Sequence, residues 1–90
     1  MQVQTKPNAL YAVIFAPAYK KQLGFAGYVR SFSSVDERGP YDILPGHENF
    51  VTVAQGNAVI FDEAGKRYDF ALGKAVVEVS ENVLKVFVDF

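Results

Sequence analysis

The stretch NVLKVFVDF, residues 82–90, alternates between apolar side chains and a mixed set along its whole length. Because successive side chains of an extended chain point to opposite faces, this alternation predicts a half-buried strand. GKAVVEVSE, residues 73–81, repeats the pattern. Leu84, Val86, Val88 and Phe90 fall on one face of the first strand, and Ala75, Val77 and Val79 fall on one face of the second.

The same period of two recurs through the chain, and no segment has a convincing helical period. Candidate strands lie near 9–16, 24–33, 50–55, 57–62, 66–72, 74–80 and 83–89, with a short one around 41–44. Turn signals separate them at residues 20–24, 34–40, 55–57, 62–66 and 80–82. Short strands at this spacing predict a single all-β domain, residues 1–90, built as a β-sandwich or flattened barrel of about eight to ten mostly antiparallel strands.

Composition excludes several classes of function. The chain has 90 residues, half of them hydrophobic, with nine basic and ten acidic residues and a net charge of −1. A nucleic-acid-binding domain of this size carries a basic stripe, so this class is not expected. There are no cysteines, which excludes disulfides, thiolate zinc sites and cysteine nucleophiles.

The N-terminal part contains a short apolar run, residues 9–18, preceded by Lys6 and interrupted by Pro17. A bilayer-spanning helix needs about 20 apolar residues, and a secretory signal has a different arrangement of charge and cleavage site. We therefore expect this run to be a buried strand and expect no membrane insertion.

The stretch GPYDILPGHENFVT, residues 39–52, holds the only histidine, His47. One histidine without cysteine is a poor ligand set for zinc, and no phosphate-binding or dinucleotide motif is present. A hydrolase could use His47 with a serine or with the acids at 36, 37, 42 and 48, but loop carboxylates are more often solvated than catalytic. We predict no catalytic, cofactor-binding or metal residue.

A longer stretch, GPYDILPGHENFVTVAQGNAVIF, resembles the N-terminal β-sandwich domain of the epsilon subunit of F-type ATP synthases, which is called delta in mitochondria. The motif ILPGH, residues 43–47, is the most specific part of the resemblance. The flanking positions that agree are Phe25, Gly27 and Val29 on one side and Glu78, Val79, Val86 and Val88 on the other. The family's C-terminal helical hairpin has no counterpart in these residues, and Glu48-Asn49-Phe50 stands where the family often has Ala-Pro-Leu.

The resemblance implies a non-catalytic subunit of the central rotor stalk, without a cofactor of its own. Its partners would be the gamma shaft, which would meet the apolar side of the sandwich, and the ring of c subunits. It would help to couple proton-driven rotation to ATP synthesis on the cytoplasmic side of a bacterial inner membrane or its organellar equivalent. The residues expected to face the c-ring are Gly39, Pro40, Tyr41, Asp42, Pro45, Gly46, His47 and Glu48.

Within that stretch, Pro45 and Gly46 predict a sharp turn that presents His47 and Glu48 outward. Ile43 and Leu44 are expected in the core, and His47 could equally be a turn cap bonded to nearby backbone. Two other functions stay open: a stand-alone β-sandwich that binds a peptide or small ligand, and, more weakly, the hydrolase that uses His47.

Overall fold

The computed structural model describes residues 9–89. It confirms the alternation predicted for the last strand. Strand β6 (Val83–Val88) buries every second side chain, and the buried set is Leu84, Val86 and Val88. The predicted place of Phe90 on the same face lies outside the described residues. Strand β6 lies between β1 (Leu10–Phe15) and β5 (Arg67–Ser80), so this apolar strand is an interior strand of the sheet.

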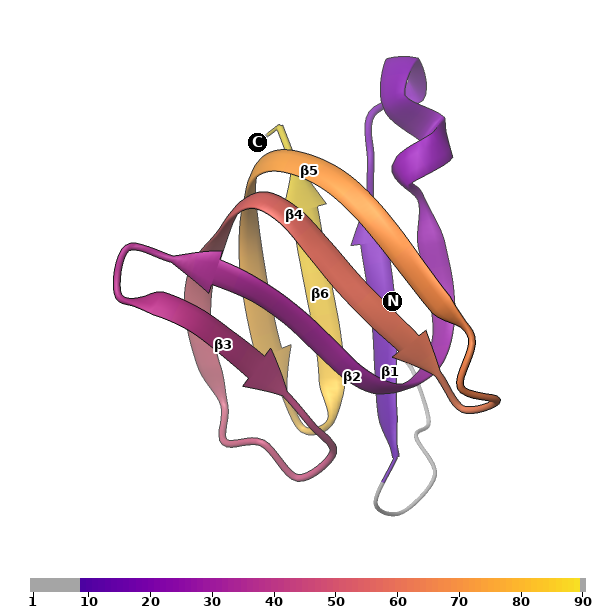
Figure 1. Cartoon of the computed structure of the whole chain (residues 1–90), viewed down its shortest axis with the longest axis vertical. Helices are drawn as coiled ribbons and strands as arrows, with labels where there is room; N and C mark the ends of the chain where they lie inside the picture. Colours follow the sequence, from indigo (N-terminus) through magenta and orange to yellow (C-terminus); the bar gives the residue numbers. More distant parts are fainter. Residues whose placement is uncertain (1–8, 90) are drawn as a thin grey trace.

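The described chain is almost entirely β-structure, which confirms the all-β prediction (Figure 1). The other elements are a short 3₁₀ helix η1 (Ala18–Leu23), β2 (Phe25–Asp36), β3 (Gly39–Ile43) and β4 (Phe50–Asp62). The strand order is β1-β6-β5-β4-β2-β3, and β1 also pairs with β2. The strands β1, β6, β5, β4 and β2 therefore close into a barrel, with β3 attached to β2 outside the ring.

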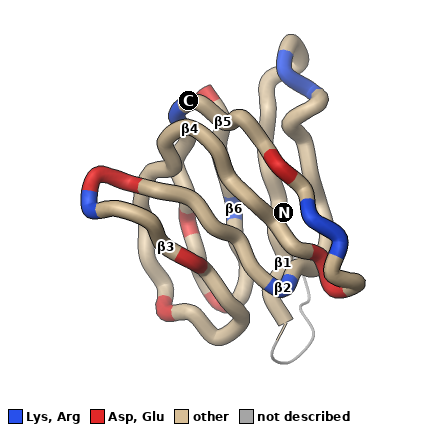
Figure 2. The backbone as a smooth tube through the Cα atoms, in the orientation of Figure 1, with Lys and Arg blue, Asp and Glu red and all other residues tan. Residues whose placement is uncertain are grey.

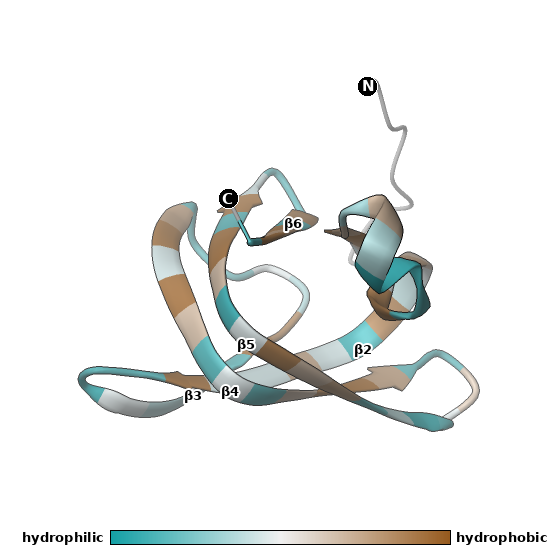
Figure 3. Cartoon of the chain, turned by 90° about the horizontal axis from the view of Figure 1, so that it is seen from above, coloured by the Kyte–Doolittle hydropathy of each residue, from teal (hydrophilic) through white to brown (hydrophobic). Residues whose placement is uncertain are grey.

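Strand β1 closes the barrel because it has a strand partner on each side. It pairs antiparallel with β2, where Ala12 lies opposite Gly27, and parallel with β6, where Ala12 lies opposite Leu84. The core fills the barrel, and brown apolar segments alternate with paler ones along the strands that surround it (Figure 3). Its fully buried members include Leu10, Ala12, Phe32, Ile43, Ala54, Ala58, Ile60, Leu72, Ala75, Val77, Leu84 and Val86.

Two facing glycines bend the longest pair of strands. Gly56 of β4 lies opposite Gly73 of β5, and both have positive φ, 78° and 70°. Asn57 then pairs with Ala71, so β5 carries one additional residue, Leu72, at the bend. Such a bulge bends a strand and increases its twist. Both strands therefore continue through the bend as the long curved ribbons of Figure 1.

The bend corrects the predicted number of strands. The described chain has six strands, because the pairs expected at 50–55 and 57–62, and at 66–72 and 74–80, are the two halves of β4 and β5. The turn expected at 55–57 is the bend itself, since glycine with positive φ serves both a turn and a bulge. The turn at 62–66 is confirmed: the Gly65 N–H donates to the Asp62 carbonyl at 3.0 Å, with φ 86° at Gly65.

Two other local expectations differ from the structure. Residues 34–40 were expected to form a loop, but β2 continues to Asp36 and β3 begins at Gly39, which leaves a tight hairpin at residues 37 and 38. Residues 20–24 were expected to be a turn, and η1 occupies most of them. A six-residue 3₁₀ helix is too short to show a sequence period.

Replacing Gly56 or Gly73 with alanine is expected to lower the free energy of unfolding by about 1–2 kcal/mol each, because an L-side chain is strained at positive φ. An added Cβ would meet no atom within 4 Å at either position, so steric crowding does not contribute. Urea unfolding of each variant measures the effect. Gly27→Ala is the control, since its Cβ would make only an ordinary 3.8 Å contact with the Phe25 ring. Equal losses in all three variants would contradict the role of positive φ.

Candidate functional site

The motif at residues 43–47 ends β3 and forms a tight turn. The His47 N–H donates to the Leu44 carbonyl at 3.1 Å, with Pro45 and Gly46 in the two central positions. Gly46 has φ 84°, and proline followed by a glycine with positive φ is the signature of a type II turn. The predicted sharp turn is confirmed. Ile43 is fully buried as expected, but the expectation for Leu44 is wrong, because 52% of its surface is exposed.

Two asparagines brace this turn against the turn between β5 and β6. The Gly46 N–H donates to Asn82 Oδ1 at 2.8 Å, and the Glu81 N–H donates to Asn49 Oδ1 at 3.0 Å. Glu81 and Asn82 both have positive φ, which suits a two-residue hairpin turn. The sequence predicted the turn at 80–82 but not the brace, because its partners lie more than thirty residues apart. The β3–β4 loop and the β5–β6 turn therefore form one surface.

His47 is half-exposed and bonds locally. Its Nδ1 lies 2.8 Å from the Glu48 carbonyl oxygen, and its ring lies 4.7 Å from that of Phe50. The bond to adjacent backbone matches the expectation of a turn cap. Within residues 9–89, no hydrogen bond joins His47 to a serine or a carboxylate, and no group of three metal-ligating side chains occurs. The structure gives the hydrolase alternative no support.

The predicted c-ring-facing residues fall into two groups. Gly39, Pro40, Tyr41 and Asp42 belong to strand β3 rather than to a loop, whereas Pro45, Gly46, His47 and Glu48 follow it. Tyr41 points into the molecule: its hydroxyl donates to the Val53 carbonyl at 3.1 Å, and burial, with a smaller effect of the nearby Asp36 carboxylate, raises the pKa of Tyr41 to about 12. Pro40, Asp42, Pro45, Gly46 and Glu48 are exposed.

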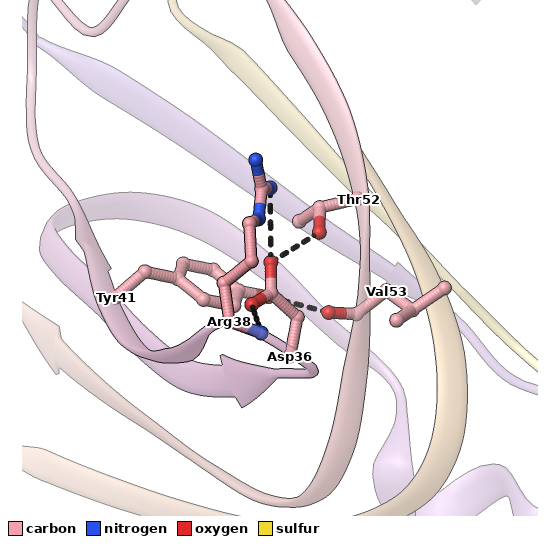
Figure 4. Close-up of polar contacts among 5 residues, drawn as sticks. All are labelled: Asp36, Arg38, Tyr41, Thr52 and Val53. Carbon is pink, nitrogen blue, oxygen red and sulfur yellow. Dashed lines mark hydrogen bonds and ion pairs between the residues drawn. The ribbon is translucent and has the colours of Figure 1, made fainter.

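Asp36 is the centre of a polar cluster where the β2–β3 hairpin approaches β4 (Figure 4). Thr52 Oγ1 donates to Asp36 Oδ2 at 2.7 Å, and the Arg38 N–H donates to Asp36 Oδ1 at 2.8 Å. Arg38 Nη2 donates to Oδ2 at 3.2 Å. The hydrogen bond from Thr52 and then that from the Arg38 backbone lower the pKa of Asp36. With its side chain only 7% exposed, Asp36 holds the hairpin against β4.

A shallow hollow of about 320 Å³ lies beside this cluster, between the hairpin tip and the first half of β4. Its lining residues are Asp36, Glu37, Arg38, Val51, Thr52 and Val53. Asp36 and Arg38 already bond one another, whereas the exposed Glu37 carboxylate has no hydrogen-bond or ion-pair partner in the described part of the chain. Sequence reasoning counted these acids as solvated loop residues and missed Thr52, which is sixteen residues from Asp36.

The charges are unevenly distributed over the molecule. Between Asp36 and Val53 the chain has four acidic residues and one basic residue, although its overall charge is only −1. Figure 2 shows acidic segments at the β2–β3 tip, where one basic segment accompanies them, on β3 and along the adjoining loops. Basic segments lie on η1, and the β4–β5 turn carries both charges. The side of the barrel that bears the β3–β4 loop is therefore acidic.

The outer face of β1 and its two neighbours is aromatic. The ring of Phe15 stacks on that of Phe87 at 5.1 Å, and the ring of Tyr11 meets that of Tyr28 edge-on at 5.0 Å. Phe15 remains 39% exposed. Aromatic side chains are enriched in protein–protein interfaces, so this face is a candidate contact surface.

No family model matches the sequence, and no curated protein matches it significantly. The fold is similar to that of a chain in the cryo-EM structure of Euglena gracilis mitochondrial ATP synthase, OSCP/F1/c-ring in rotational state 1, with a TM-score of 0.79 and 16% sequence identity. The match covers 94% of this chain and 53% of that chain, so this chain spans about half the length of its structural relative. At this identity the similarity shows the fold. In residues 9–89, no helix has the length and apolarity needed to cross a membrane.

Asp36→Asn is expected to be less stable than the parent chain at neutral pH, and the difference should shrink on acidification. A carboxylate with a lowered folded-state pKa stabilises the fold above its unfolded pKa, near 3.9, and this contribution is lost as the pH falls through the folded-state value. Urea midpoints from neutral pH to about pH 2 measure this. Glu37→Gln is the control and should leave the curve nearly unchanged. The Asp36→Asn variant should still lose some stability at low pH, because hydrogen bonds also lower the pKa values of Asp62 and Asp89. A constant difference at all pH values would contradict the assignment.

Proposed function

We propose that this chain is a non-catalytic subunit of the central rotor stalk of a proton-translocating F-type ATP synthase, corresponding to the N-terminal domain of epsilon (mitochondrial delta). The observation that carries the proposal is the fold, which matches a chain of an ATP synthase structure over 94% of the residues here. The ILPGH motif adds to it, because it forms a braced, outward-facing turn. This is the geometry expected of a recognition loop.

The proposal assigns different partners to two surfaces. The β3–β4 loop, braced by the β5–β6 turn, would meet the polar loops of the c-ring, with Asp42, Pro45, Gly46, His47 and Glu48 as its exposed or half-exposed contacts. A pre-ordered polar loop suits this role. Complementary polar contacts across an interface determine how the two surfaces align more than how tightly they bind. Tyr41 is not proposed as a contact, because its hydroxyl is bonded within the domain.

The gamma shaft would meet the aromatic outer face of β1, β2 and β6. This face combines apolar rings with partial exposure, whereas the hairpin side of the barrel is acidic. Bound to gamma and the c-ring, the chain would be a peripheral part of a membrane complex, on the cytoplasmic side of a bacterial membrane or its organellar equivalent. It would transmit rotation without chemistry of its own.

Co-expression with the gamma subunit from the same source, followed by size-exclusion chromatography, tests the assignment of gamma. We expect a stoichiometric complex that Phe15→Glu abolishes, because a buried charge without a partner opposes docking. Val35→Glu is the matched control: Val35 is 37% exposed, close to the 39% of Phe15, but lies at the end of β2 near the hairpin. Loss of the complex in both variants would contradict the proposed face. Separate elution of two folded proteins would favour the stand-alone binding domain.

His47→Ala is expected to weaken co-purification with the c-ring in an assembled complex while leaving thermal stability almost unchanged. In the described part of the chain, the ring of His47 lies against that of Phe50 and hydrogen-bonds the adjacent Glu48 carbonyl. Its loss should therefore lower the free energy of unfolding by no more than about 1 kcal/mol. Pull-down with a tagged c subunit, paired with thermal unfolding, separates the two effects. A large loss of stability with normal assembly would make His47 a structural cap alone.

A further inference from the structure

Two strand edges beside the closed ring have no strand partner: the outer edge of β3 and the edge of the first half of β4. Strand β3 pairs only with β2, and the first half of β4 pairs only with β5, since the pairing of β4 with β2 covers Val59–Asp62. No other strand of the described chain lies along either edge. An open edge presents main-chain N–H and C=O groups that can pair with another extended chain.

The edge of β3 is blunted. Asp36 and Gly39 close a two-residue hairpin, so Gly39, Tyr41 and Ile43 direct their main-chain groups toward β2. Pro40 and Asp42 therefore face the open edge, and proline has no N–H to donate. Proline on an edge strand is a common protection against pairing. The N–H of Asp42 is therefore the only main-chain donor that β3 directs at this edge, beside the carbonyl acceptors of Pro40 and Asp42.

The edge of β4 carries no proline, and the Tyr41 hydroxyl occupies only one of its main-chain groups, the Val53 carbonyl. Tyr41, on the side away from β5, donates to the carbonyl of Val53, so that carbonyl points away from β5. In an antiparallel strand the N–H and C=O of one residue point the same way, and the direction repeats every second residue. The N–H of Val53 and both main-chain groups of Val51 therefore face the hollow. The side chain of Val51 is 66% exposed, which leaves the approach open.

The surroundings of this edge define the chemistry of its occupant. The hollow of about 320 Å³ extends along Val51, Thr52 and Val53, and the unpartnered Glu37 carboxylate lies at its rim. The lining contains two acidic residues, Asp36 and Glu37, and one basic residue, Arg38. Because Arg38 is paired with Asp36, Glu37 supplies the unbalanced negative charge. Main-chain groups on an open edge select an extended peptide, and the charge selects a basic one.

We propose that the Val51–Val53 edge of β4 is a docking site for an extended, lysine- or arginine-bearing segment of a partner protein, which adds to β4 as a strand. The segment's main chain pairs with both main-chain groups of Val51 and with the N–H of Val53, whose carbonyl stays bonded to Tyr41. A basic side chain of the segment reaches Glu37 across the hollow. This site is separate from the surfaces proposed for gamma and the c-ring and does not depend on them.

Amide hydrogen exchange followed by NMR tests the edge in the free protein. The amides of Val51 and Val53 should exchange rapidly, whereas those of Thr52 and Ala54, which point toward β5, should be protected. Protection of Val51 as strong as that of Thr52 would overturn the proposal. Val51→Pro should fold, because its N–H is free, and Thr52→Pro should not.

Titration with the peptide acetyl-Thr-Val-Lys-Val-Lys-Val-Thr-amide tests the occupant. We expect binding that protects the Val51 and Val53 amides, is lost in Val51→Pro and is weakened about twofold to fivefold by Glu37→Gln, as for an exposed ion pair. Peptides N-methylated on the pairing residues, or with glutamate in place of lysine, are the controls and should bind at least about tenfold more weakly. Equal binding of all peptides, or no protection at Val51, would overturn the proposal. Concentration-dependent dimerisation of the free chain through this edge would do the same, because a second copy would then be the occupant.

Discussion

The facing glycines at positions 56 and 73 are the constraint on which the rest of the barrel depends. Positive φ at both residues lets β4 and β5 bend together without breaking their pairing, so each long strand serves two parts of the barrel. Only the second half of β4, after the bend, pairs with β2; the first half, before the bend, lies apart from it. Asp36 and Tyr41 then bridge the gap with side chains where a strand ladder would otherwise stand. The polar cluster, the hollow and the open edge all follow from this one departure.

The proposed c-ring loop and the open edge of β4 are neighbours in sequence but are held by different means. The loop is pinned through Asn49 and Asn82 to the β5–β6 turn, whereas the edge is held by Asp36 through Thr52. A change in one set of bonds need not affect the other. The acidic character is common to both, so the proposed basic segment would meet the same side of the barrel as the proposed c-ring contact. The aromatic face lies elsewhere and is available for apolar contacts.

Much of the fold could be predicted from the sequence because alternation is a local signal. The buried faces of β5 and β6, the turn at Gly65 and the turn at Pro45-Gly46 all depend on residues close together in the chain. The errors have physical causes. Gly56 looked like the end of a strand because turns and bulges use the same conformation. Leu44 looked buried because it is apolar and directly follows the buried Ile43. The contacts of Asp36 with Thr52, and of Asn82 with Gly46, could not be predicted, since they depend on how distant strands cross.

The double pairing of β1 also governs the order in which the domain can form. Tyr11 of β1 pairs with Tyr28 early in the chain, but on its other side it pairs with Val83 near the end of the described residues. Contacts of such long sequence separation close large loops and slow folding. During synthesis the β1–β2 pair can form first, yet the other side of β1 stays open until β6 has emerged from the ribosome. Until then the nascent chain exposes apolar strand edges, and the last step of folding is the closure of the barrel.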